Sequence, residues 1–147
     1  MRFSRRSFLK TTVATGSLAV SLRSTSFASG ANDQIRIAVI GLNGRGGSHL
    51  RGFKDHVVAL CDCDARVLGA AAESFTNRTQ RKVDAVQDYR KLLERSDIDA
   101  VSIATPNHTH ALIAIEACLA GKDVYVEKPV SHNVWEGRQL VNAARKY

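Results

Sequence analysis

The chain has 147 residues, enough for one ordinary domain, and its 44% hydrophobic and 24% charged residues are typical of a globular protein. Its net charge of +7 is uneven, because the first 28 residues hold five basic side chains and no acid, whereas the rest hold 16 basic and 14 acidic residues. That nearly balanced remainder lacks the basic stripe of nucleic-acid-binding proteins, so the composition argues against a nucleic-acid partner.

Residues 1–28 have the layout of an export signal. The stretch SRRSFLK at residues 4–10 contains a twin arginine, a mild apolar stretch follows it, and small residues precede a cleavage site expected after Ala28. The apolar stretch is too short for a stable membrane span, which needs roughly 20 apolar residues. The segment resembles a bacterial twin-arginine (Tat) signal peptide. The resemblance implies that the Tat translocon exports the folded protein to the periplasm, together with any nucleotide that it needs.

Strand and helix patterns alternate through residues 33–147, which we predict to form the second unit of the chain. In chain order we expect a strand at 35–40, a helix at 45–53, a strand at 56–61, a helix at 64–75, a strand at 82–86, a helix at 88–96, a strand at 99–105, a helix at 109–121, a strand at 123–127 and a helix at 133–147. Residues 76–82 are expected to form a surface loop. This alternation predicts an α/β fold, a doubly wound parallel sheet with helices on both faces.

A glycine-rich turn follows the first predicted strand. Gly41 and Gly46 occupy the first and last positions of the dinucleotide-binding pattern G-x-G-x-x-G, while Asn43 stands at the middle position and Gly44 is shifted by one residue. Bare backbone at the start of a helix lets main-chain amides approach a pyrophosphate, which the helix N-terminus also attracts. Arg45 either bonds to a phosphate or points into solvent. The turn predicts a Rossmann-type nucleotide site.

An acidic residue at the end of the second strand supports this prediction. Asp62 follows Gly41 by 21 residues, close to the spacing of about 20 at which a carboxylate accepts hydrogen bonds from the adenosine ribose. Its charge would repel a 2′-phosphate, so we expect NAD as the cofactor rather than NADP. Asp64 is expected to cap the following helix. We assign no chemistry to Cys61, Cys63 and Cys118, and the sequence predicts no metal site.

Two further strand ends carry unusual motifs, ATPNHTHA at residues 104–111 and EKPVSHNVWEG at residues 127–137. Together with IGLNGRGG and CDCD, they make residues 33–147 resemble the N-terminal half of the Gfo/Idh/MocA oxidoreductases. The resemblance implies that Thr105, Pro106 and Asn107 line the nicotinamide side of the cofactor. His110 holds the histidine position of the motif, as a cofactor contact or as a hydrogen-bonding group at the helix start.

The motif EKP carries the chemistry that the resemblance implies. Glu127 belongs to the cofactor site, and Lys128 lies beside substrate and nicotinamide as the candidate catalytic residue. Oxidation of a sugar hydroxyl needs a group that takes its proton while hydride leaves the carbon, and a lysine can accept or relay that proton. Pro129 is commonly preceded by a cis peptide bond in this family.

The resemblance also implies a second, substrate-binding domain that commonly mediates oligomerisation, and we expect it to be absent from this chain. Three functions remain open at this point. The leading one is the NAD-binding portion of an exported oxidoreductase that acts on the CH–OH group of a sugar or polyol. The alternatives are an NAD-dependent glycosidase of the same family with no net redox change, and a non-catalytic NAD-binding module.

Overall fold

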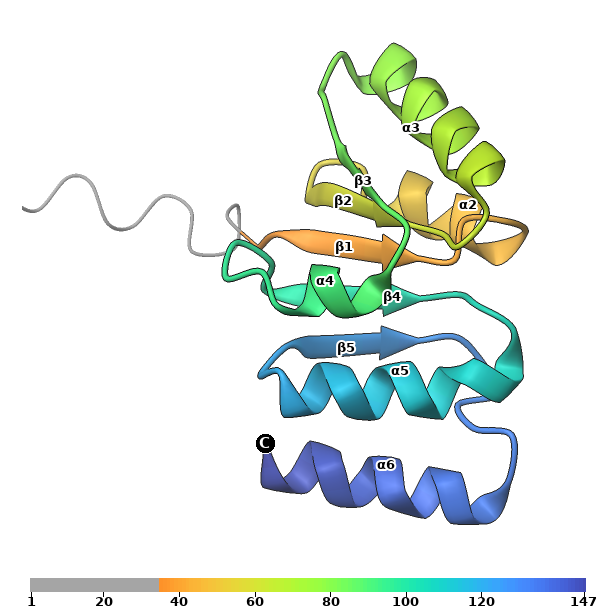
Figure 1. Ribbon diagram of the computed structural model, residues 1–147, viewed down its shortest axis with the longest axis vertical. Coiled ribbons are helices and arrows are strands. Elements are labelled where there is room, and N and C mark those ends of the chain that lie inside the picture. Colours follow the sequence, from red (N-terminus) through yellow and green to blue (C-terminus); the bar gives the residue numbers. More distant parts are fainter. Residues whose placement is uncertain (1–34) are drawn as a thin grey trace, which may run out of the picture. The chain divides into compact units, whose positions relative to one another are not determined.

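The computed structural model describes residues 35–147, and the predicted signal peptide lies outside the described residues (Figure 1). The elements are, in chain order, β1 (Ile37–Ile40), α2 (Arg45–Gly52), β2 (Val57–Cys61), α3 (Ala65–Thr79), β3 (Asp84–Val86), α4 (Tyr89–Leu93), β4 (Ala100–Ile103), α5 (Asn107–Leu119), β5 (Asp123–Val126) and α6 (Val134–Lys146). No helix within residues 35–147 combines the length and the apolar character that crossing a bilayer requires.

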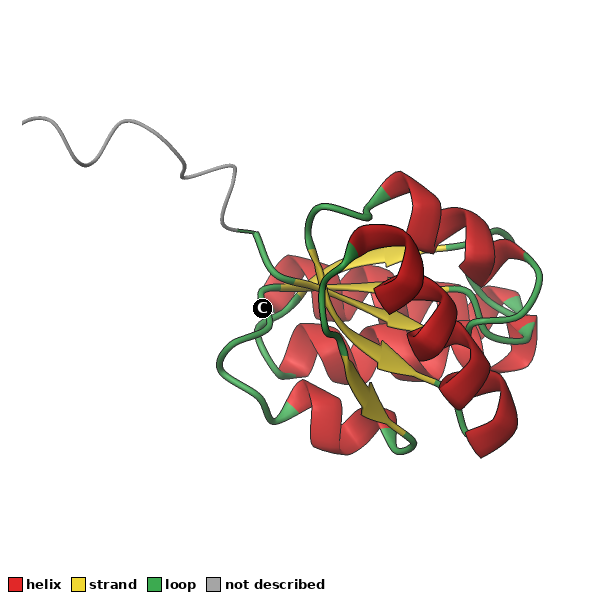
Figure 2. Ribbon diagram, turned by 90° about the horizontal axis from the view of Figure 1, so that it is seen from above, coloured by secondary structure: helices red, strands yellow, loops and turns green. Residues whose placement is uncertain are grey.

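The five strands form one parallel sheet in the order β3-β2-β1-β4-β5, with helices on both of its faces (Figure 2). The predicted Rossmann-type α/β fold is confirmed. The chain leaves β1 toward β2 and β3 on one side and returns to β4 and β5 on the other. Open α/β sheets bind ligands at the carboxyl ends of the strands where the strand order reverses, which in this sheet are the ends of β1 and β4.

Two apolar clusters fill the space between the sheet and the helices. On one face, Ala38 and Ile40 of β1 pack in a cluster with residues of α4 and α5. On the other face, Val39 belongs to a cluster with Leu50 of α2 and Phe75 of α3. Side chains alternate between the faces of a strand, so both faces of β1 must be apolar. This explains why the run IAVI contains no polar residue.

Asp64 and Asn133 cap helices, and the cap at Asp64 was expected from the sequence. Asp64 accepts a hydrogen bond from the Arg66 amide at 2.9 Å and caps α3. Asn133 caps α6 by accepting from the Glu136 amide, also at 2.9 Å. In the usual capping box, the Glu side chain accepts a hydrogen bond from the main-chain amide of the cap residue itself. Here the Glu136 carboxylate accepts from the amide of His132, one residue before the cap.

Most element boundaries differ from the sequence prediction by one or two residues, and those of α3 and α4 differ by more. Helix α3 continues to Thr79, so the loop predicted at residues 76–82 was wrong for its first four residues. Phe75, only 1% exposed, anchors this last part of the helix against the sheet, and a left-handed Gln80 ends it. Helix α4 is only five residues long and ends at Leu93, and α5 begins two residues earlier than expected, at Asn107.

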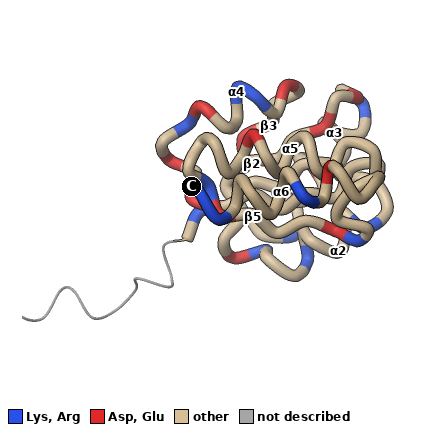
Figure 3. Tube along the Cα trace, turned by 90° about the horizontal axis from the view of Figure 1, so that it is seen from below, with Lys and Arg blue, Asp and Glu red and all other residues tan. Residues whose placement is uncertain are grey.

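Acidic and basic residues are interspersed along the described trace (Figure 3).

The glycine turn brings the start of α2 unusually close to the end of β1. A Cβ atom on Gly46 would lie 2.0 Å from the carbonyl oxygen of Gly41, closer than any side-chain atom can come. Gly41 has a φ of 84°, and a Cβ atom there would lie 2.7 Å from the Thr105 amide nitrogen. Both positions therefore require glycine, and Gly46 permits the close packing of helix on strand.

Replacing Gly46 by Ala should lower the free energy of unfolding by about 2–3 kcal/mol, because the new methyl group has to displace the Gly41 carbonyl. Urea denaturation measures this loss. The matched control is Gly69→Ala in α3, where a Cβ atom would have no neighbour within 4 Å. That substitution should raise the free energy of unfolding by about 0.5–1 kcal/mol. Equal effects of the two substitutions would contradict the packing argument.

Candidate nucleotide-binding site

The predicted site residues meet at the carboxyl edge of the sheet. The ladder of main-chain hydrogen bonds continues past the strands there: the amide of Gly41 donates to Cys61 at 2.8 Å, that of Ala104 to Ile40 at 2.8 Å and that of Glu127 to Ile103 at 2.9 Å. These bonds fix the four segments after β1, β2, β4 and β5 beside one another. The glycine turn, Asp62 and the two strand-end motifs consequently lie at one edge of the sheet.

Asp62 braces the glycine turn. Its Oδ2 accepts a hydrogen bond from the Leu42 amide at 3.0 Å, and its Oδ1 accepts from the Asp64 amide at 3.0 Å. The side chain therefore ties the end of β2 to the turn after β1. An ionised carboxylate offers about four acceptor positions, so these two bonds leave room for ribose hydroxyls.

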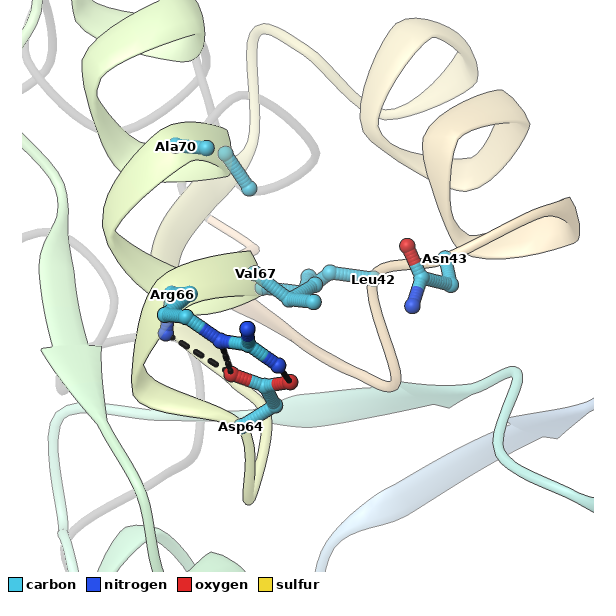
Figure 4. Close-up of a pocket in the computed structure, with 7 residues that line it drawn as sticks. Leu42, Asn43, Asp64, Arg66, Val67 and Ala70 are labelled. Atoms are coloured by element: carbon cyan, nitrogen blue, oxygen red, sulfur yellow. Dashed lines mark hydrogen bonds and ion pairs between the residues drawn. The ribbon is translucent and has the colours of Figure 1, made fainter.

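A pocket of about 480 Å³ opens between the glycine turn and the first turns of α3 (Figure 4). Leu42 and Asn43 form one wall, and Val67 and Ala70 of α3 form the facing wall. At its edge, Arg66 donates to both carboxylate oxygens of Asp64, at 3.4 and 3.1 Å, and these bonds hold the pKa of Asp64 below its ordinary value. An apolar slot with polar groups at its rim suits a flat heterocycle with an attached sugar.

Gly44 has a φ of 54° and no neighbour within 4 Å of a Cβ position, so main-chain groups there are open to approach. Asn43, Gly44 and Arg45 are all exposed, whereas Gly46 is buried. Arg45 is the first residue of α2, and the structure shows a contact that neither expectation for it included. Its Nε and Nη2 lie 2.9 and 2.8 Å from Oε1 of Glu127, although two-thirds of its side chain is exposed.

Glu127 is the most strongly bound carboxylate of this edge. It is 8% exposed, and its Oε1 receives hydrogen bonds from Nε2 of His49 at 3.0 Å and from Arg45. These two donors lower the pKa of Glu127 to about 2, and the hydrogen bond from His49 has the larger effect. The other oxygen, Oε2, accepts from the Lys128 amide at 3.1 Å. Glu127 is thus ionised and faces the protein interior.

The sequence assigned no role to His49, which joins Glu127 to the sheet. The ring is 5% exposed, and its Nδ1 lies 2.8 Å from Oγ of Ser102 in β4. One signal was available in the sequence, because His49 follows Arg45 by four residues and both therefore point from the same face of α2. That spacing does not reveal that both side chains bind Glu127.

His110 lies between the two family motifs. Its Nδ1 is 2.7 Å from the carbonyl oxygen of Pro129, and its Nε2 is 2.7 Å from that of Thr105. The ring is 2% exposed and contacts the main chain of both site loops. It is hydrogen-bonded at the helix start, and it also connects the loop after β4 with the loop after β5.

The remaining predicted residues lie at the same edge of the sheet, after β4 and β5. Thr105 is half-buried and Pro106 and Asn107 are exposed, at the start of α5. The side chain of Lys128 is exposed at the end of β5, and the Lys128–Pro129 peptide bond is cis, as the resemblance implied. No group of three or more potential metal ligands occurs within residues 35–147.

Replacing Glu127 by Gln should destabilise the fold most at neutral pH. The pKa of Glu127 falls from an ordinary 4.5 to about 2 in the folded state, so its contribution to stability is complete above 4.5 and is lost as the pH falls toward 2. Thermal melts should show a Tm difference from the parent that shrinks across this range. Glu94→Gln, at an exposed glutamate at the end of α4, is the control and should show no such change. A Tm difference independent of pH would contradict the assignment.

Residues 35–147 match the sequence model of the Gfo/Idh/MocA family, an oxidoreductase family with an NAD-binding Rossmann fold. A glycosyl hydrolase family 109 protein of Shewanella pealeana is 34% identical to this chain in an alignment of 122 residues, which covers 78% of this chain and 27% of that protein. The chain thus spans about a quarter of the length of the curated relatives that it matches.

Two solved structures show the same fold. WlbA dehydrogenase from Bordetella pertussis, in complex with NADH and UDP-GlcNAcA, has a TM-score of 0.68 at 26% identity over 78% of this chain and 34% of that one. Levoglucosan dehydrogenase, in complex with NADH and levoglucosan, has a TM-score of 0.68 at 27% identity over 76% of this chain and 32% of that one. This chain therefore belongs to the Gfo/Idh/MocA oxidoreductase family, and residues 35–147 are its NAD-binding Rossmann domain.

Proposed function

We propose that this domain binds NAD for an exported oxidoreductase that transfers hydride from a CH–OH group of a sugar or polyol. The observation that carries the proposal is that the glycine turn and the EKP segment lie at the same edge of the sheet, where Arg45 pairs with Glu127 and Lys128 is exposed. Solved relatives of similar fold bind NADH together with levoglucosan or UDP-GlcNAcA. This chain spans about a third of each of those structures.

The residues present fit NAD. The exposed main chain at Gly44 and the N-terminus of α2 suit the diphosphate, and the free acceptor positions of Asp62 suit the ribose hydroxyls. The pocket beside Val67 has the apolar walls that an adenine ring needs. In this arrangement Thr105, Pro106 and Asn107 border the nicotinamide end.

When bound, NAD supplies the hydride acceptor. The chain's own part is to orient the substrate and to handle the hydroxyl proton, a role that we assign to Nζ of Lys128. An ammonium group there also stabilises negative charge that develops on the substrate oxygen as the proton leaves. Glu127 takes no proton in this scheme, because its carboxylate is held ionised by His49 and Arg45.

A second candidate is an NAD-dependent glycosidase, in which the sugar is oxidised and reduced again with no net redox change. The relatives named glycosyl hydrolase family 109 protein favour it, with identities of 34 to 38%. The same lysine and the same cofactor site serve both reactions. The two functions differ in their products, and this difference is measurable.

Assays of the full-length protein distinguish these functions. Net formation of NADH from a sugar panel supports the oxidoreductase, and release of nitrophenol from nitrophenyl glycosides without added NAD supports the glycosidase. In either case Lys128→Ala should lower kcat by about 100-fold or more, the usual contribution of a positioned acid or base. Lys91→Ala, at an exposed lysine of α4, is the control and should keep full activity. Unchanged kcat in Lys128→Ala would favour a non-catalytic NAD-binding module.

Export by the Tat route is part of the proposal and rests on the twin arginine Arg5–Arg6. Tat substrates cross the membrane folded, so the NAD site can be filled before export. Fractionation of a bacterial host measures where the protein is located. Replacing both arginines by lysine should keep the protein in the cytoplasm. Periplasmic protein in that double variant would contradict the Tat assignment. We expect assembly into a homo-oligomer only together with the substrate-binding domain that the family resemblance implies.

Asp62→Ala should weaken NAD binding by about tenfold or more, since a hydrogen bond to a charged group contributes about 1.5 kcal/mol or more. The loss of charge should also reduce the preference for NAD over NADP. Because Asp62 also braces the glycine turn, Asp62→Asn separates the two roles by keeping an acceptor without the charge. Asp123→Ala, at the opposite edge of the sheet, is the control. Unchanged calorimetric affinities for both nucleotides would remove Asp62 from the site.

A further inference from the structure

A buried row of side chains leads from the middle of the sheet to the EKP segment, and the proposed function makes no use of its inner part. Ser102 of β4 is 1% exposed, His49 of α2 is 5% exposed and Glu127 after β5 is 8% exposed. Their polar atoms are joined at 2.8 Å from Ser102 Oγ to His49 Nδ1 and at 3.0 Å from His49 Nε2 to Glu127 Oε1. Polar groups buried this deeply require hydrogen-bond partners, and here Ser102, His49 and Glu127 serve as partners for one another.

The direction of these hydrogen bonds follows from the chemistry of the groups. An ionised carboxylate only accepts, so Nε2 of His49 must carry a hydrogen and donate it to Glu127. In the neutral ring Nδ1 is then an acceptor, and the hydroxyl of Ser102 donates to it. Ser102 thus favours the one neutral tautomer of His49 that can hold Glu127.

Aromatic packing fixes the plane of the His49 ring. The ring of Tyr125 lies edge-on to it with centroids 5.4 Å apart, and Phe53 lies edge-on at 6.3 Å. The two aromatic rings also contact each other, at 5.7 Å. A ring enclosed in this way keeps its Nε2 directed at Glu127, and the geometry of the bond is set before any ligand arrives.

Glu127 in turn holds the main chain of the next residue, Lys128. Its Oε1 is held by His49 and Arg45, which leaves Oε2 oriented toward the main chain, where it accepts from the Lys128 amide at 3.1 Å. The long side chain of Lys128 is exposed and makes no ion pair within residues 35–147. The position of the Lys128 side chain therefore depends on where its main chain is held.

We infer that His49 is a positioning residue for Lys128, acting through the carboxylate of Glu127 with Ser102 as its support. The inference rests on the proposed function for the importance of Lys128, but the contact itself can be measured without any reaction. A displacement of about 1 Å in a reacting group can lower a rate by about 100-fold, so a residue that never touches substrate has a large effect through this route.

The test compares two variants of similar size and polarity. His49→Gln keeps an N–H donor near the position of Nε2, whereas His49→Asn reaches only toward Ser102 and leaves Glu127 without this donor. The spectroscopic readout is the Lys128 amide, by its proton chemical shift and its hydrogen exchange in the full-length protein. The Lys128 amide should stay protected in His49→Gln and should shift and exchange faster in His49→Asn, while the amide of Ala104, bonded to Ile40, stays unchanged in both.

The kinetic readout separates positioning from stability. His49→Asn should lower kcat by about 100-fold with little change in the KM for NAD, and His49→Gln should restore most of it. His56→Asn, at a histidine before the amino end of β2, is the control and should leave kcat unchanged. If His49→Asn does not fold, Ser102→Ala provides the same amide measurement with a smaller expected shift in the same direction.

An unchanged Lys128 amide in a folded His49→Asn protein would overturn the inference, and so would equal losses in the Gln and Asn variants. A faster exchange spread evenly over all amides would also overturn it, because that result describes a structural histidine. If the amide results hold but the parent protein turns over no sugar, the positional link stands and the proposed function fails. The two proposals can therefore fail separately.

Discussion

The site depends on the contact between the main chain of α2 and the end of β1. The position of a Cβ atom on Gly46 would fall 2.0 Å from the Gly41 carbonyl oxygen, and one on Gly41 would fall 2.7 Å from the amide nitrogen of Thr105. Three segments, the end of β1, the start of α2 and the loop after β4, are thus packed main chain against main chain. Their spacing decides how near the free amides of α2 come to a ligand at the sheet edge.

The second constraint is the charge of Glu127. A carboxylate with so little exposure is tolerated only when donors replace its water, and here His49, Arg45 and the Lys128 amide do so. Those donors come from two different segments of the chain. The requirement to satisfy one buried charge therefore ties the helix of the nucleotide site to the segment that carries the candidate proton-transfer group.

Much of the fold was predictable because its signals are local. Alternating apolar runs predicted five strands in a parallel sheet, and the caps at Asp64 and Asn133 depend on residues within three positions of each other. The boundaries were less predictable. Polar residues 76–79 read as a loop, but the burial of Phe75 on the sheet holds that turn helical. Tertiary packing outweighed a local preference there.

The sequence by itself determined the order of the elements, the glycine turn and the strand-end motifs, because each of these is written in neighbouring residues and in their spacing. It also pointed to the family that the comparison of residues 35–147 shows. Only the tertiary structure decided that Arg45 and His49 share Glu127, at separations of 82 and 78 residues. Such contacts arise from the strand order β1-β4-β5 and its register, and local periodicity does not encode which side chains a sheet brings together.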